Sequence, residues 1–326
     1  MSTTPKNKIL LLGAGELGTS FVHSLAHLPT HHLTLAIRSP AKYSSLASTY
    51  PSLTLLELDL SAPSSTLVSI FANYDVIISA TGFMQTPDTL VKLCHEVLAA
   101  GKLRSSKQEK TGEGDGNRRL WFFPWQWGVD YDITLDGQGL MPLFGAQKHI
   151  RDILRAEAQA SDVTWTVVGT GIFMSFLFEE FWGIVDRDTA SNELGERGEV
   201  TVRALRDWSH KVTVTDVRDI GRVLARIVSG AVDATDKVVY IAGQTVSYGE
   251  LADIVKKVSG KEVKREAWSI EYLEGELAKD PENDLKKYRL VFAREGVWWD
   301  EKKTVNRTLG MEMMRVEEYA RKTLEK

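Results

Sequence analysis

Three glycines near the start of the chain have the spacing of a phosphate-binding turn. Gly13, Gly15 and Gly18 follow an apolar run, 9–12, and precede a segment with a helical pattern, 16–28. In such a turn the first glycine makes the bend, the second lets the backbone approach a pyrophosphate, and the third lets helix and strand pack closely. The pyrophosphate then lies at a helix N-terminus, which favours an anion. A dinucleotide site is therefore preferred over a purely structural glycine-rich turn.

The residues after the second predicted strand indicate which nucleotide binds. Many NAD-binding chains place an acidic residue there, which binds the ribose hydroxyls, but this chain has Arg38 and then Lys42. A guanidinium binds phosphate oxygens through two parallel N–H groups. We therefore expect NADP(H), with both cations at its 2′-phosphate; the alternative is an ordinary solvated pair at a helix start. Asp59, at the end of the third predicted strand, is expected either near the adenine or as a turn or cap residue.

The elements that must position these residues alternate along the first half of the chain. Strands are predicted at 9–12, 33–37, 53–58, 75–80, 120–123 and 164–168, and helices at 16–28, 40–48, 64–72, 87–100 and 146–160. This order predicts βαβ units. The predicted class is α/β: a Rossmann doubly wound parallel sheet with a smaller C-terminal substrate lobe.

The expected division of the chain follows from this order. Residues 1–174 are predicted to form the NADP-binding Rossmann domain, and 175–326 mostly the substrate-side lobe, with 211–242 returning to the sheet. Residues 102–117 are polar and glycine-rich, which predicts a flexible insertion. Because it links a helix to the next strand, it is expected at the sheet edge opposite the ligands.

Composition argues against several classes of function. The 326 residues carry a net charge of −4, which gives no electrostatic case for nucleic acid or an anionic membrane. Cys94 is the only cysteine, so an intrachain disulfide is excluded and a cytoplasmic protein is expected. His23 and His27 stand four residues apart without a third ligand, and no metal site is expected.

Four segments give the chain a family resemblance. They are the glycine turn with Arg38, and the segments 75–82, 121–130 and 164–173. In this order they resemble the NmrA-like, isoflavone-reductase-like members of the atypical short-chain dehydrogenases, and 170–179 is most similar to fungal members of secondary metabolism. The resemblance implies a Rossmann domain, NADP(H) and often reduction of aromatic or phenolic compounds. It also covers non-catalytic NADP-sensing regulators.

The expected cofactor-binding residues come from the ends of several predicted strands. The loop after the sixth strand is expected beside the nicotinamide, with Phe173 as a wall. The full set is Gly13, Gly15, Glu16, Leu17, Gly18, Arg38, Lys42, Asp59, Ala80, Thr81, Gly82, Gly169, Thr170 and Phe173.

The candidate catalytic residues, Gln147 and Lys148, lie in the predicted helix 146–160. No tyrosine is followed by a lysine four residues later, so the usual proton-donating pair of short-chain dehydrogenases is absent. Isoflavone-reductase relatives have a lysine in a Phe-x-x-Lys-x-x-Ile-Arg run. The matching run, 144–151, has Gln147 at that position and Lys148 one residue later. One residue turns a side chain by about 100° around a helix, so Lys148 is expected to be solvated unless the helix start shifts. Gln147 can orient a ligand but cannot act as a general acid.

Aromatic residues after the fifth strand indicate a flat substrate. Core packing is the competing explanation for them. The expected substrate contacts are Trp125, Gln126, Trp127, Tyr131 and Phe176. The preferred function is an NADP(H)-dependent oxidoreductase acting on an aromatic or polycyclic small molecule, in secondary metabolism. The alternatives are a non-catalytic NADP-sensing regulator and an NADP-binding enzyme with a rearrangement-type reaction.

Overall fold

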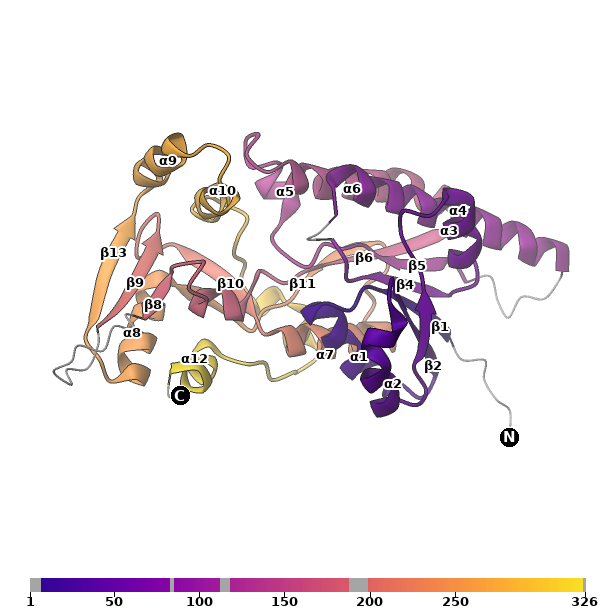
Figure 1. Cartoon of the computed structure of the whole chain (residues 1–326), viewed down its shortest axis with the longest axis horizontal. Helices are drawn as coiled ribbons and strands as arrows, with labels where there is room; N and C mark the ends of the chain where they lie inside the picture. Colours follow the sequence, from indigo (N-terminus) through magenta and orange to yellow (C-terminus); the bar gives the residue numbers. More distant parts are fainter. Residues whose placement is uncertain (1–6, 83–84, 112–117, 188–198, 325–326) are drawn as a thin grey trace. The chain divides into compact units, whose positions relative to one another are not determined.

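The computed structural model describes residues 7–82, 85–111, 118–187 and 199–324 (Figure 1). The chain forms two compact units. Unit 1 comprises 1–126, 145–168 and 220–239, and unit 2 comprises 127–144, 169–219 and 240–326. This differs from the expected division at residue 174, because the loops after the fifth and sixth strands carry the chain into unit 2 and back.

Unit 1 is built on a seven-stranded sheet in the order β11-β6-β5-β4-β1-β2-β3. The strands are β1 Asn7–Leu12, β2 His31–Ile37, β3 Thr54–Glu57, β4 Val76–Ser79, β5 Leu120–Phe123, β6 Val163–Gly169 and β11 Lys237–Tyr240. The pairs from β3 through β1 to β6 are all parallel. The predicted α/β class and parallel sheet are confirmed. The strand order reverses between β1 and β4, which is where open α/β sheets bind ligands.

Helices cover both faces of this sheet. They are α1 Glu16–Leu25, α2 Ser44–Thr49, α3 Ser64–Phe71, α4 Pro87–Thr111, α6 Pro142–Glu157 and α7 Val217–Val228, with short 3₁₀ turns at Pro40–Tyr43 and Gln159–Ser161. Figure 1 shows α3, α4 and α6 on one face and α1 and α7 on the other. Leu10, Phe21 and Ile77 are fully buried, so apolar side chains pack between the sheet and its helices.

The polar segment after residue 101 corrects one prediction. Residues 102–111 belong to α4 and are not part of a flexible insertion. The segment is rich in lysine, arginine, glutamine and glutamate, which favour helices. Arg104 also fixes it to the sheet by donating hydrogen bonds to the backbone oxygen of Tyr74 and to the carboxylate of Asp75. The rest of the predicted insertion, 112–117, lies outside the described residues.

Unit 2 contains two three-stranded sheets, β12-β10-β7 and β13-β9-β8. The strands are β7 Ile172–Phe173, β8 Val185–Arg187, β9 Val200–Leu205, β10 Lys211–Thr215, β12 Gln244–Ser247 and β13 Val263–Trp268. The helices are α5 Tyr131–Thr134, α8 Tyr248–Ser259, α9 Ile270–Lys279, α10 Asp284–Phe292, α11 Val305–Thr308 and α12 Val316–Leu324, with 3₁₀ turns at Met174–Phe178 and Glu301–Lys303. The sequence predicts that the segment 211–242 returns to the main sheet. In the structure β11 joins that sheet, whereas β10 belongs to a three-stranded sheet of unit 2.

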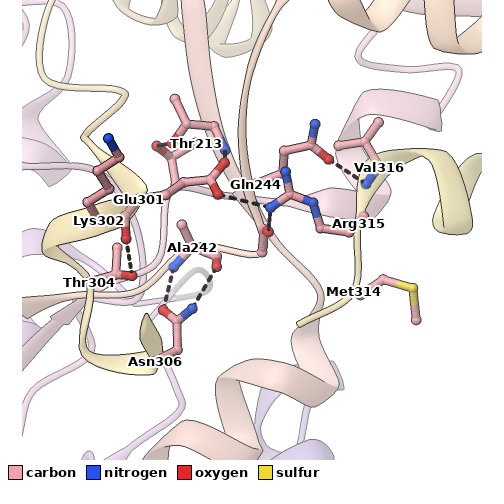
Figure 2. Close-up of polar contacts among 12 residues, drawn as sticks. Thr213, Ala242, Gln244, Glu301, Lys302, Thr304, Asn306, Met314, Arg315 and Val316 are labelled. Atoms are coloured by element: carbon pink, nitrogen blue, oxygen red, sulfur yellow. Dashed lines mark hydrogen bonds and ion pairs between the residues drawn. The ribbon is translucent and has the colours of Figure 1, made fainter. Parts of the chain in front are cut away.

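Side chains of the C-terminal segment bind the backbone beside β12 (Figure 2). Asn306 accepts a hydrogen bond from the amide of Ala242 at 3.0 Å and donates one to its carbonyl at 3.1 Å. Arg315 donates to the carbonyl of Gly243 at 2.9 Å and forms an ion pair with Glu301 at 2.9 Å. The buried Asn306 therefore bonds the backbone as a neighbouring strand would, and it makes the C-terminal segment part of unit 2.

Candidate functional site

In the glycine turn after β1, one glycine has space around it for a side chain and two glycines do not. Gly13 has φ +93°, and a Cβ there would lie 2.8 Å from Cβ of Thr81. A Cβ on Gly18 would lie 2.2 Å from the carbonyl oxygen of Gly13. Gly15 is the N-cap of α1 without a side-chain cap, and a Cβ there would meet no atom within 4 Å. The turn therefore fits a pyrophosphate, because Gly15 leaves the helix N-terminus accessible. Glu16 is exposed and Leu17 is buried.

The ends of β2 and β3 bring opposite charges near each other. Arg38 and Lys42 are both exposed, and Lys42 lies in the 3₁₀ turn after β2. Asp59 accepts a hydrogen bond from the amide of Ser61 at 2.9 Å. Its pKa is lowered by its hydrogen bonds with Ser61 and, to a smaller extent, by the charge of Arg38. This geometry places Asp59 in a turn, and its expected place near the adenine stays a prediction; Arg38 and Lys42 lie on the surface after β2.

The end of β4 lies beside the glycine turn. The amide of Ala80 donates to the carbonyl of Leu12 at 2.9 Å, and the close approach of Gly13 to Thr81 joins the two strand ends. Gly82 lies directly against the indole of Trp125, since a Cβ on Gly82 would be 1.8 Å from Cδ2 of that ring. Trp125 is half-buried. The carboxyl edge of β1 and β4 therefore carries both the turn and an aromatic side chain.

The two candidate catalytic residues lie on different sides of α6. The Nζ atom of Lys148 lies 2.6 and 2.7 Å from the two carboxylate oxygens of Asp152, one helical turn later. The side chain of Gln147 is buried, and among the described residues neither its Oε1 nor its Nε2 has a hydrogen-bond partner. An unpaired buried amide costs about 1–3 kcal/mol. The helical-wheel prediction that Lys148 points away from the core side agrees with this geometry.

Gln126 and Arg151 hold this part of α6 to the loop after β5. Both are buried, and Gln126 donates from Nε2 to the backbone oxygen of Gln147 at 2.9 Å. Its Oε1 accepts from Nε of Arg151 at 2.8 Å. Both ends of the Gln126 amide thus have partners within the protein, so its predicted substrate contact stays a prediction. Sequence reasoning missed Arg151, although its position four residues after Gln147 puts the two on one helix face.

Gly169, Thr170 and Phe173 belong to unit 2, at and after the end of β6. A Cβ on Gly169 would lie 2.7 Å from Cδ1 of Tyr240. Thr170 is fully buried, and its backbone oxygen accepts a hydrogen bond from the hydroxyl of Thr215 at 2.7 Å. Phe173 is half-buried. The loop is therefore firmly held, and its expected contact with the nicotinamide stays a prediction.

The aromatic residues of unit 2 divide between its core and its surface. Tyr131 is in the apolar core, with its ring 5.1 Å from that of Phe144, and Trp127 is also buried. Phe176 is half-buried and contacts Phe173, at 5.9 Å between ring centroids. Phe181 then contacts Phe176 at 5.4 Å and is 52% exposed. Sequence reasoning missed Phe181, whose only signal was its position near the other phenylalanines.

Other features of the described residues are separate from these groups. A cavity of about 330 Å³ in unit 2 is lined by none of the predicted site residues; it is formed by Gln138, Leu140, Glu274, Leu277, Ala278, Pro281, Leu290 and Arg294. No helix in the described part of the chain could cross a membrane. The same residues contain no group of three or more potential metal ligands, and His23 instead lies 2.7 Å from the hydroxyl of Tyr50.

Sequence comparison assigns the family. The model of the NmrA-like family matches residues 121–320. A relative from Gibberella moniliformis (strain M3125 / FGSC 7600), named an NmrA-like family domain-containing oxidoreductase, is 36% identical over 96% of this chain and 97% of its own length. The chain belongs to the NmrA-like family. The match of residues 9–100 to the saccharopine dehydrogenase NADP-binding domain supports the predicted cofactor, NADP(H).

Solved structures of two other proteins share the fold. An isoflavone reductase has a TM-score of 0.70 at 19% identity, covering 97% of this chain and 99% of that one. An NADPH-dependent quinone oxidoreductase from Escherichia coli, in complex with NADPH, has a TM-score of 0.68 at 19% identity, covering 96% and 98%. At these identities the likeness establishes the fold and leaves the substrate open.

Proposed function

We propose that this NmrA-like protein is an NADP(H)-dependent oxidoreductase that acts on an aromatic or polycyclic small molecule in secondary metabolism. The observation that carries the proposal is the free space around Gly15 at the N-terminus of α1. An added Cβ would meet no atom there, whereas one at Gly13 or Gly18 would clash. The partly exposed series Phe173, Phe176 and Phe181 supports a flat aromatic substrate. The names of the relative and of the similar structures, which are reductases and oxidoreductases, agree with it.

In this proposal the chain binds and orients the two reactants. The amides at the start of α1 hold the pyrophosphate, and Arg38 with Lys42 holds the 2′-phosphate. Bound NADPH supplies the hydride. Lys148 is paired with Asp152 and is not assigned a proton-transfer role. In this proposal the proton that follows the hydride comes from water.

Two measurements test this function. NADPH and NADH binding are compared by calorimetric titration, and NADPH consumption is followed by absorbance with a set of quinones, conjugated enones and aromatic ethers. We expect tighter binding of NADPH and turnover of at least one conjugated carbonyl compound. Equal affinity for NADPH and NADH would contradict the proposed contact of Arg38 with the 2′-phosphate.

A non-catalytic NADP-sensing regulator is the second candidate. It is favoured by the neutral Gln147, which cannot give a proton. A sensor must discriminate NADP⁺ from NADPH in binding and consume no NADPH with any compound tested. Comparable affinity for both cofactor forms, together with turnover, would exclude it. A rearrangement-type reaction would convert a substrate without net NADPH consumption, which product analysis by mass spectrometry detects.

The cytoplasm is the proposed location. Cys94 is buried, and burial raises the pKa of its thiol to about 12. The thiol therefore stays protonated and unreactive at neutral pH. A chain with one inert cysteine needs no disulfide and fits a reducing compartment.

A further inference from the structure

Two buried glutamines in unit 1 differ in how their amides are used. Gln126 and Gln147 are each 1% exposed. The amide of Gln126 donates to the backbone of Gln147 and accepts from Arg151. The amide of Gln147 has neither a donor nor an acceptor partner among the described residues. Buried polar groups of native proteins are nearly always hydrogen-bonded, so the amide of Gln147 needs a partner that is not among the described residues.

The place of Gln147 in the fold indicates what kind of partner that is. The strand β6 begins six residues after α6 ends, so the first turns of α6 lie at the opposite, carboxyl edge of the parallel sheet. The glycine turn follows β1 at the same edge. Trp125 lies against Gly82 at the end of β4, and the next residue, Gln126, bonds to Gln147. These contacts connect Gln147 to the edge where ligands of such sheets bind.

We propose that the carboxamide of Gln147 recognises a ligand carbonyl oxygen that has an N–H or O–H beside it. Nε2 donates to the carbonyl oxygen, and Oε1 accepts from the neighbouring donor. The proposal rests on the proposed function, since its ligand is part of a hydride-transfer complex. Two sources present this pair of groups: the carboxamide of the nicotinamide, and a conjugated carbonyl substrate with an adjacent amine or hydroxyl. Arg151 acts through Gln126 as a positioning residue.

The neutral amide fits a carbonyl that becomes an oxyanion. When a conjugated carbonyl substrate is reduced, it gains a C–H bond with the hydride's two electrons, and its π electrons move to the oxygen. Nε2 then donates a hydrogen bond to that oxygen and keeps its proton, and the oxyanion takes a proton from water. NADPH, the reductant, leaves as NADP⁺.

Gln147→Leu tests the proposal, with Gln126→Leu as its matched control. Both changes replace a 1% exposed amide with an apolar side chain of similar size. In the ligand-free protein, Q147L should raise the Tm by about 2–4 °C, as expected for removing one unpaired polar group. Q126L should lower the Tm, because it removes the acceptor of Nε of the buried Arg151 and the side-chain donor to the backbone oxygen of Gln147. A fall in Tm for Q147L similar to that of Q126L would show a protein partner and overturn the proposal.

Ligand binding to Q147L distinguishes the two sources. In the cofactor arm, NADPH is compared with its 3-acetylpyridine analogue, which lacks the amide N–H. In the substrate arm, 2-amino-1,4-naphthoquinone and 1,4-naphthoquinone are titrated into the NADP⁺ complex. In one of the two comparisons, we expect Q147L to bind the compound with the neighbouring N–H, NADPH or 2-amino-1,4-naphthoquinone, about tenfold or more weakly than the wild type does. Its affinity for the compound without that N–H should change little. Wild-type affinity for all four probes would overturn the proposal. A wild-type protein that binds no NADPH would refute the proposed function itself, whatever the Tm of Q147L.

Discussion

Gly15→Ala should separate the binding of the cofactor from the stability of the fold. Gly15 has φ −68° and ψ −167°, which any residue adopts, and its added Cβ meets no atom within 4 Å. The free energy of unfolding should therefore fall by no more than about 1 kcal/mol, the effect of a poorer N-cap residue. Gly18→Ala is the control, because its Cβ would lie 2.2 Å from the carbonyl oxygen of Gly13. Such overpacking costs about 1–3 kcal/mol.

The effect of Gly15→Ala on binding should be much larger. Its methyl group occupies the space through which a pyrophosphate approaches the free amides of α1. Hydrogen bonds to a charged group contribute about 1.5–3 kcal/mol, so NADPH affinity should fall by about tenfold to a hundredfold. Calorimetric titration with NADPH and urea unfolding measure the two effects on the same samples. Wild-type affinity in Gly15→Ala would refute the assignment of this turn to the pyrophosphate.

Three further predictions concern charged and titratable groups. Arg38→Ala should weaken NADPH by about tenfold and leave NADH unchanged in calorimetric titration; equal losses would contradict a 2′-phosphate contact. Lys148→Ala should keep turnover within about twofold in the NADPH absorbance assay, because its Nζ is paired with Asp152; a loss of about a hundredfold, typical of an acid–base group, would show a catalytic role. Burial lowers the pKa of His210 below its ordinary 6.5, so protonation favours the unfolded chain, and the free energy of unfolding should fall as the pH drops below 6.5. His210→Gln should lessen that fall between pH 8 and 5 in urea unfolding, whereas parallel curves would contradict this role.

The order of elements in unit 1 could be predicted because their signals are local. The strands of the sheet are short apolar runs, and the turn at Gly13 requires a positive φ that glycine adopts readily. The helix at 102–111 was missed because its helix-favouring residues run into the glycine-rich stretch 112–116, and because its contact with the sheet is distant in sequence. Arg104 bonds to Tyr74 and Asp75, some thirty residues earlier, and no local pattern reports such a contact.

The site was only partly predictable, for a related reason. The helical period predicts that Lys148 and Gln147 lie on different sides of the helix, since a rotation of about 100° per residue is a local property. That the amide of Gln147 has no partner depends on every group around it, including Gln126 from another segment. Tyr131 and Phe176 are similar in sequence terms, yet one is in the core and the other is half-exposed. That division depends on packing between elements distant in the chain.

The interleaving of the two units has a consequence for biosynthesis. The chain passes from one unit to the other after residues 126, 144, 168, 219 and 239. During synthesis from the N-terminus, the sheet of unit 1 lacks β11 until residue 240 has left the ribosome. Unit 2 lacks the contact of Asn306 with Ala242 until residue 306 has emerged. Multidomain chains commonly fold one domain at a time as they emerge. Here the sheet of unit 1 cannot be completed before residue 240 has emerged, and unit 2 cannot form this contact before Asn306 has emerged, so part of each unit must wait for residues that follow segments of the other unit.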